Sequence, residues 1–271
     1  MMVKRSASLR YPLGKLEYKY DERTLQISEF IDPEFWFPPS YDFDKDRRSF
    51  PVTSWGNTLW GNCVIASRAN HLLRLERIEQ RRTVKLKDYH VIDKYKELTG
   101  SLNPGDTFDQ GLVVLDTLKD WRNNGWHLDL IRKHLSQHKI YKIAAFGELN
   151  PLDKVQLRRA CFYLFGIQMG FWLPLSAQTQ TSQGYWDIVE SSPYSKPGSW
   201  GGHLVYAKKY DTDNFYVLTW GKEIRVTNAF IEKYCDEAWA IVDDFDFWRD
   251  KPTIQVDKMI EYLTNIGATK R

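Results

Sequence analysis

The chain has little cysteine, no long apolar run and little net charge. Its three cysteines among 271 residues lie at scattered spacings, so they form no disulfide framework, and a reducing, cytoplasmic location is the simpler expectation. The longest apolar stretches are broken at Gly166 and Gln168 and are too short to cross a bilayer. A net charge of +3 is too small to predict nucleic-acid binding. The sequence therefore predicts a soluble protein without a membrane span.

The sequence is expected to divide into three parts. Residues 1–35 form an N-terminal arm, in which residues 16–20 alternate like an edge strand. Residues 36–243 are predicted to form one α+β domain, mainly helical over 36–160 and mainly antiparallel β over 161–243. Residues 244–271 form a C-terminal extension with an amphipathic helix, whose apolar face is Val256, Met259, Ile260, Leu263 and Ile266. The arm and this helix are candidates for contacts with assembly partners.

The chemistry concentrates at one cysteine and one distant histidine. Apolar residues recur at three- and four-residue steps after Cys63, which predicts a helix that begins within two residues of it and continues to about residue 82. A helix N-terminus and a nearby imidazolium favour a thiolate, so Cys63 is expected to be the most reactive thiol. Cys161 and Cys235 are expected to be core residues. His203 opens a β-rich run behind two glycines, and the pair predicts a thiol nucleophile with a histidine base.

Several segments between residues 36 and 243 resemble papain-family cysteine peptidases. Residues 37–43, Phe-Pro-Pro-Ser-Tyr-Asp-Phe, are similar to the segment that opens the mature domain of these enzymes. Residues 219–221, Thr-Trp-Gly, are similar to the family's Asn-Ser-Trp-Gly motif without its asparagine. The resemblance implies a papain-like fold, with a cleft between a helical half and an antiparallel β half. It also implies that Cys63 attacks, that His203 takes and returns the proton, and that Asn57 stands where the family has an oxyanion-stabilising glutamine.

The group that orients His203 is left open. The family's asparagine accepts a hydrogen bond from the imidazole, and counting 16 residues forward from His203 reaches Thr219, whose hydroxyl can do the same. Strand alternation argues against Thr219, because Leu218 and Trp220 would share one face and Thr219 the other. The alternative is that no third member exists. The resemblance also implies a substrate cleft lined by Trp60, Gly61, Asn62, Gly202 and Trp220.

Three functions remain open. The first is a cysteine hydrolase of peptide or isopeptide bonds, with a peptide or protein substrate. The second is a catalytically weakened papain-like structural or binding protein. The variant motif is similar to papain-like proteins of bacteriophages and prophages, for which a virion location and virion partners would follow. The third is a murein-cleaving amidase or endopeptidase. The arm is shorter than the inhibitory pro-segment of most papain-like enzymes and is not expected to act as one.

No cofactor and no metal is expected. His134 and His138 are four residues apart and would share a helix face, but no Glu or Cys accompanies them at ligand spacing. A solvated helix face is the expected structure for this pair.

Overall fold

The computed structural model describes residues 11–45, 50–78, 84–132, 135–190, 193–243 and 254–266. The helices are α1 (Cys63–Ile78), α2 (Asp88–Thr99), α3 (Val114–Asn123), α4 (Lys154–Tyr163), α5 (Ser176–Gln183), α6 (Asn228–Tyr234) and α7 (Val256–Asn265). The strands are β1 (Tyr41–Asp42), β2 (Trp126–Arg132), β3 (Leu135–Tyr141), β4 (Ile143–Leu149), β5 (Ile167–Leu173), β6 (Tyr185–Trp186), β7 (Gly201–Tyr210), β8 (Asn214–Thr219), β9 (Lys222–Thr227) and β10 (Cys235–Asp243). Single 3-10 turns lie at Ile27–Glu29 and Pro193–Ser195.

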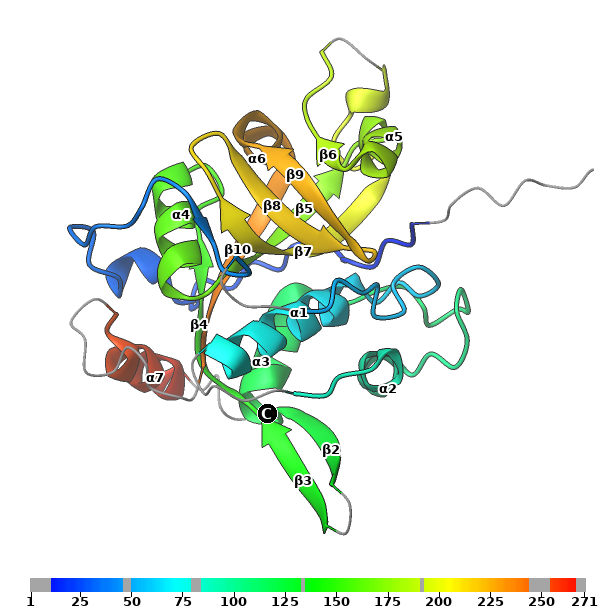
Figure 1. Ribbon diagram of the computed structural model, residues 1–271, viewed down its shortest axis with the longest axis vertical. Helices are drawn as coiled ribbons and strands as arrows, with labels where there is room; N and C mark the ends of the chain where they lie inside the picture. The colour runs from blue at the N-terminus through cyan, green and yellow to red at the C-terminus, as the bar shows by residue number, and fades with distance from the viewer. Residues whose placement is uncertain are drawn as a thin grey trace, which may run out of the picture.

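One large sheet forms the body of the β half. Its strand order within the described residues is β4-β10-β5-β7-β8-β9-β6, and β1 pairs with β7. Neighbouring strands are antiparallel except β6 and β9, which are parallel. Figure 1 shows α1, α2 and α3 together below this sheet, with the separate β2–β3 hairpin extending away from them. The predicted α+β class is confirmed.

Helix α1 is the centre of the helical half. Its residues 63–76 are all buried, and it packs on β7 and β8. A helix buried on all sides must satisfy its charged side chains inside the protein. Arg68 Nη1 lies 3.1 Å from Asp120 Oδ2, and Arg74 Nη2 lies 2.7 Å from Asp44 Oδ2. These ion pairs fix the rotation of α1 about its axis and therefore the direction in which Cys63 leaves its first turn.

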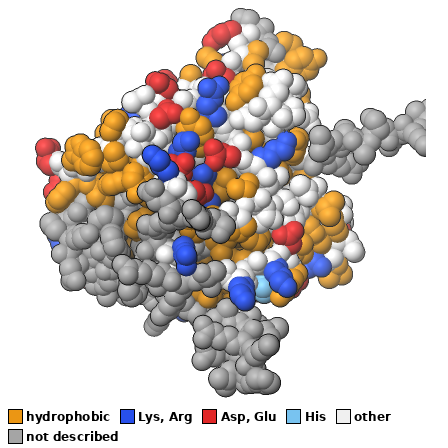
Figure 2. All heavy atoms as spheres, viewed as in Figure 1, with side chains coloured by type: hydrophobic (Ala, Val, Ile, Leu, Met, Phe, Trp, Pro, Cys, Tyr) orange, Lys and Arg blue, Asp and Glu red, His pale blue; other side chains and the backbone are white. Residues whose placement is uncertain are grey.

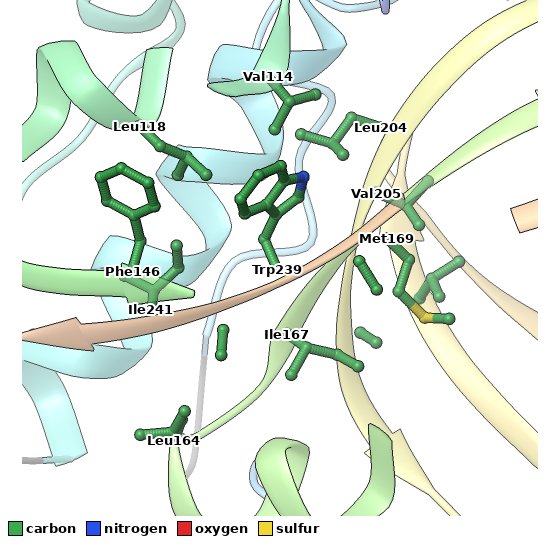
Figure 3. Packing of buried hydrophobic residues seen from close by; sticks show 14 of the residues in the cluster. Val114, Leu118, Phe146, Leu164, Ile167, Met169, Leu204, Val205, Trp239 and Ile241 are labelled. Atoms are coloured by element: carbon green, nitrogen blue, oxygen red, sulfur yellow. The ribbon is translucent and has the colours of Figure 1, made fainter. Parts of the chain in front are cut away.

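The apolar core lies between these helices and the sheet. Figure 3 shows the indole of Trp239, on β10, among Val114 and Leu118 of α3 and Leu204 of β7. Trp239 is completely buried, and burial of a large apolar side chain stabilises a fold by roughly 3 kcal/mol. Its Nε1 donates to Glu237 Oε2 at 2.7 Å. The core therefore also fixes the position of a buried carboxylate.

Three strands lie in the region predicted to be mainly helical. Strands β2, β3 and β4 cover most of residues 126–149, and β4 joins the large sheet beside β10. The run from Ile143 to Leu149 is buried on both faces except at Glu148, so its sequence shows no period-two alternation that would mark a strand. His138 lies in β3, so the predicted helix face is wrong there; His134 lies outside the described residues.

Other boundaries agree more closely with the sequence. Helix α1 begins at Cys63, as predicted, and residues 79–83 lie outside the described part of the chain. Helix α4 begins at Lys154, because the Asp153 carboxylate accepts from Val155 and Gln156 N–H and caps the helix. The C-terminal helix is present as α7 and packs against β4.

The N-terminal arm runs between the two halves of the molecule. Figure 1 shows this segment, in blue, passing between β7 and α1. It pairs with the rest of the chain through isolated bridges, Lys15 with Leu112 and Gln26 with Glu148. The predicted edge strand at residues 16–20 does not form, since no extended partner lies along it in the described structure.

The surface carries charges of both signs. On the face shown in Figure 2, acidic and basic side chains lie interspersed. Lys208 is buried, and its Nζ lies 2.8 Å from Glu223 Oε2 and 3.1 Å from Asp44 Oδ2. Among the described helices, none combines the length and apolar composition that crossing a membrane requires.

Candidate active site

Cys63 opens α1 behind a loop that is tightly held. The Asn62 side-chain amide donates to the Trp55 carbonyl at 2.9 Å, and Gly61 N–H donates to Asp109 Oδ1 at 2.9 Å. Trp55 itself has a left-handed backbone, with φ of 53°, which costs a non-glycine residue about 1 kcal/mol. The loop therefore holds the sulfur at the helix N-terminus, where unpaired N–H groups favour negative charge.

The Cys63 sulfur accepts N–H groups from three segments. Leu204 N–H donates to Sγ at 3.5 Å, and the N–H groups of Gly14 and Val64 also donate to it. Cys63 is only 1% exposed. Burial raises the pKa of the Cys63 thiol to about 11, although these N–H groups and the charge of Lys15 lower it. In this conformation, burial therefore favours the neutral thiol over the thiolate that the helix N-terminus would stabilise.

His203 lies on β7 and is completely buried. Its Nε2 lies 2.6 Å from Thr219 Oγ1, and the Trp220 indole stacks on the imidazole with ring centroids 4.0 Å apart. Burial lowers the pKa of His203 to about 3, so the ring is neutral. Its Nδ1 is buried without a hydrogen-bond partner in the described part of the chain. With the Nε2 proton donated to Thr219, Nδ1 carries the lone pair that a base needs.

Strand register explains why Thr219 rather than Leu218 meets the imidazole. Leu218 pairs with Tyr206 across β7 and β8, so these two side chains share one face. Thr219 is the next residue along β8 and therefore faces the side of β7 that carries His203. Trp220 departs from this alternation because it begins the β8–β9 turn with φ of 48°, followed by Gly221 at 72°. Both Thr219 and Trp220 consequently reach His203.

Asn57 lies in the loop before Cys63 and is buried. Its amide nitrogen donates to the Trp60 carbonyl at 2.9 Å, and its amide oxygen has no hydrogen-bond partner among the described residues. The side chain thus bends the loop back toward Trp60. Trp60 packs edge-on against Tyr95, with ring centroids 6.1 Å apart.

The N-terminal arm occupies the cleft over the thiol. Lys15 N–H donates to the Gly202 carbonyl at 3.1 Å, and Leu112 N–H donates to the Gly14 carbonyl at 2.9 Å. A Cβ on Gly14 would lie 1.6 Å from the Gly61 carbonyl oxygen, so only bare backbone fits beside the sulfur. This arm, although shorter than the pro-segment of most papain-like enzymes, therefore lies over the thiol.

The arm is also held on the histidine side of the cleft. Trp220 Nε1 donates to the Pro12 carbonyl at 3.1 Å, and the rings of Tyr11 and Trp220 lie 4.9 Å apart. Of the five predicted cleft residues, Gly61, Gly202 and Trp220 meet the arm. Asn62 instead supports the loop from inside, as its bond to Trp55 shows.

Three residues that support the site were not predicted. Asp109 accepts from Gly61 N–H and from the Tyr95 hydroxyl, the latter at 2.7 Å, while Gly111 N–H donates to the Tyr95 oxygen at 3.1 Å. The third is Lys15, whose ammonium is buried beside two carboxylates. No local pattern marks these residues, because their partners lie far away in the sequence.

No cluster of three or more His, Cys, Asp or Glu side chains suited to a metal occurs in the described ranges.

Comparisons with known proteins agree with this geometry at the level of the fold. No protein-family model and no curated protein matches the sequence. Among solved structures, xylellain, a cysteine protease from Xylella fastidiosa, superposes with a TM-score of 0.64 and 16% identity over 90% of this chain and 99% of its own. The Carica candamarcensis cysteine protease CMS1MS2, in complex with E-64, gives 0.52 and 16% over 76% and 99%. Procathepsin B S9 from Trypanosoma congolense gives 0.55 and 10% over 86% and 83%. The chain has the fold of papain-like cysteine proteases.

Proposed function

We propose that this chain, with its papain-like fold, is a latent cysteine hydrolase of peptide or isopeptide bonds. The observation that carries the proposal is the placement of Cys63 and His203. The thiol lies at a helix N-terminus, where three N–H groups donate to it. His203 precedes Leu204, the residue whose N–H donates to the sulfur, and its imidazole is held by Thr219 and by the face of Trp220, while its Nδ1 has no hydrogen-bond partner among the described residues. Such an arrangement stabilises a thiolate and orients a base once water enters.

In the proposed reaction, departure of the arm admits water and substrate. Loss of burial moves both pKa values back toward their ordinary range, and His203 takes the Cys63 proton. The thiolate attacks the carbonyl carbon, an S–C bond forms, and the oxyanion is stabilised by the Cys63 N–H with the Asn57 amide. His203 then protonates the leaving amine as the C–N bond breaks. Water, deprotonated by His203, adds to the thioester, the S–C bond breaks, and the carboxylic acid leaves.

The arm is not positioned for its own cleavage. Gly14 presents its N–H to the sulfur, while its carbonyl accepts from Leu112 N–H. The nucleophile therefore faces a hydrogen-bond donor instead of a carbonyl carbon. This is the geometry of an inhibitor segment that is retained intact.

Reaction with E-64, the compound in complex with the Carica protease, provides the direct test. The test uses the full chain with Lys15→Glu, which replaces the buried ammonium of the arm by a carboxylate. This variant is incubated with E-64 and with a peptide library. Covalent E-64 at Cys63 in the intact mass, together with peptide cleavage, is expected. Cys63→Ala in the same background is expected to abolish both, with the melting temperature within a few degrees, because truncating one small buried side chain costs about 1 kcal/mol.

The matched control is Cys161→Ala, which removes another buried cysteine at a distance from the cleft. It is expected to keep both E-64 labelling and turnover. Cleavage that survives Cys63→Ala would refute the mechanism, as would an opened site in which Cys63 reacts no faster than Cys161.

Thr219→Val is expected to lower kcat by about 10- to 100-fold, since the imidazole loses the hydroxyl that holds its Nε2. Thr219→Ser keeps a hydroxyl at the same position and is expected to stay within a few-fold of the parent. The measurement is kcat on one cleaved peptide in the opened background. Equal rates for the valine and serine variants would remove Thr219 from the proposed site.

A structural or binding role, including one in a virion, is the second candidate. The closed cleft and the neutral thiol favour it, because neither requires turnover. It predicts that the opened Lys15→Glu chain cleaves no peptide and no purified murein. Murein cleavage without peptide cleavage would instead identify an amidase or endopeptidase of the cell wall.

A further inference from the structure

Lys15 fills a buried acidic pocket beside the nucleophile. Its side chain has no solvent exposure, and Nζ lies 2.6 Å from Asp236 Oδ2 and 3.0 Å from Glu237 Oε1. The ammonium also lies 4.9 Å from the centre of the Trp172 ring, within the range of a cation–π contact. Burial alone would lower the pKa of Lys15, but attraction to Glu237 and Asp236 more than offsets this and raises it. The pocket is thus built around a cation.

The pocket has room for a long side chain because residue 170 is glycine. A Cβ at Gly170 would lie 2.5 Å from Lys15 Cε and 2.5 Å from Glu237 Cγ. Gly170 pairs with Glu237 on one side of β5 and with Leu204 on the other. Leu204 is the residue whose N–H donates to the Cys63 sulfur. Gly170 therefore lies between Glu237 of the pocket and Leu204, the residue that donates to the nucleophile.

Removal of the arm leaves two carboxylates without their cation. Glu237 is 1% exposed, and its second oxygen is already bonded to Trp239 Nε1. Asp236 Oδ1 is buried and has no hydrogen-bond partner among the described residues. A buried carboxylate that loses its partner is strongly destabilised, so the open pocket favours any cationic side chain that can enter. Arginine, with more donors than lysine, can also satisfy Asp236 Oδ1.

The arm shows how a substrate would bring such a side chain there. Lys15 N–H donates to the Gly202 carbonyl, and Gly14 lies against the Gly61 carbonyl, two residues before Cys63. An extended peptide that uses the same carbonyl places one side chain in the pocket and the neighbouring residue at Cys63.

We propose that the pocket formed by Asp236, Glu237, Trp172 and Gly170 selects substrates with a lysine or arginine adjacent to the residue that lies at Cys63. This inference rests on the proposed hydrolase function for its consequence in catalysis. The preference of the pocket itself is a binding property and is measurable without turnover.

The binding test uses the full chain with Cys63→Ala and Lys15→Glu, which lacks the nucleophile and the competing ammonium. The probes are fluorescent peptides Tyr-Pro-Leu-Gly-X-Leu, the sequence of residues 11–16, with X as lysine, arginine, norleucine or glutamate. Norleucine keeps most of the chain length and removes the charge. Lysine and arginine are expected to bind about 30-fold or more tightly than norleucine, and glutamate not detectably.

Two variants of the pocket test whether its carboxylates cause the preference for lysine over norleucine. Glu237→Gln is expected to reduce the lysine-to-norleucine ratio by about tenfold or more, and Asp236→Asn, at a partly exposed position, provides the same test if the first variant does not fold. Glu148→Gln is the matched control, since Glu148 contacts the arm through Tyr18 outside the pocket. It is expected to leave the ratio unchanged.

The same library cleaved by the opened enzyme with Cys63 intact provides the catalytic test. Cleavage is expected next to lysine or arginine in the pocket position, at either side of the scissile bond. Norleucine bound as tightly as lysine, or efficient cleavage without a basic preference, would overturn the assignment of the pocket. Absence of all cleavage together with tight, charge-dependent binding would instead overturn the hydrolase proposal and leave the pocket assignment standing.

Discussion

Lys15→Glu is expected to accelerate alkylation of Cys63 by iodoacetamide by about 100-fold or more. The substitution places a third carboxylate against Asp236 and Glu237, where the wild-type ammonium lies within 3.0 Å of both. Breaking a buried ion pair costs about 3–5 kcal/mol, which corresponds to a shift of roughly 10²- to 10⁴-fold in the closed-to-open equilibrium. In the closed wild type, Cys63 is 1% exposed and its pKa is raised, so its labelling is expected to be slow.

Lys19→Glu is the control for this experiment. It makes the same charge change on the same arm, but Lys19 is half exposed and pairs with Asp116 at the surface. Exposed pairs contribute less than about 1 kcal/mol, so labelling of Cys63 is expected to change by no more than a few-fold. Mass spectrometry of the labelled peptides measures the rate, with buried Cys161 as an internal reference. Equal rates for the two charge reversals would mean that Lys15 does not hold the arm closed.

The free energy of unfolding is expected to fall steeply below about pH 6.5. His71 and His203 are completely buried, and burial lowers the pKa of each to about 3. The unfolded chain binds protons at these residues near their ordinary pKa, about 6.5, while the folded chain does not until near pH 3. Stability is therefore complete above about pH 6.5 and is lost as the pH falls toward 3. Each histidine contributes a slope of up to about 1.4 kcal/mol per pH unit.

Urea unfolding between pH 7 and pH 5 measures this slope. His71→Gln keeps a neutral polar side chain near the Leu164 carbonyl, which lies 3.4 Å from His71 Nε2. It is expected to reduce the slope by about 1.4 kcal/mol per pH unit. His127→Gln, at an exposed position on β2, is the comparison variant. A wild-type unfolding free energy that stays level across this range would contradict the burial of neutral histidines.

The elements that the sequence predicts well are those with strong local patterns. The start of α1 at Cys63 and the amphipathic α7 each follow from periodicity within one segment. Strand β4 was harder to predict, because both of its faces are buried and its apolar run resembles a helical core segment as much as a strand.

The site shows the same division between local and distant information. The contact between His203 and Thr219 was one of two alternatives, and the register of β7 against β8 was needed to decide between them. No local sequence pattern predicted that the N-terminal arm covers Cys63. It depends on Gly14 meeting Gly61 and on Lys15 meeting Glu237, 222 residues away in the chain (237 − 15), and such pairings arise only when the tertiary fold is complete.

The glycine at position 14 allows the arm only one register. Leu112 and Gly202 bond the backbone on either side of it, and a Cβ at Gly14 or at Gly111 would lie within 2.3 Å of main-chain atoms across the gap. A slip by one residue would force Leu13 or Lys15 through that gap and withdraw the ammonium from its carboxylates. A register shifted by one residue is therefore not stable. We expect the arm to leave as a unit, so that in the labelling experiment each molecule has its thiol either covered or exposed, and a partial average labelling rate reflects the fraction of molecules with the arm displaced.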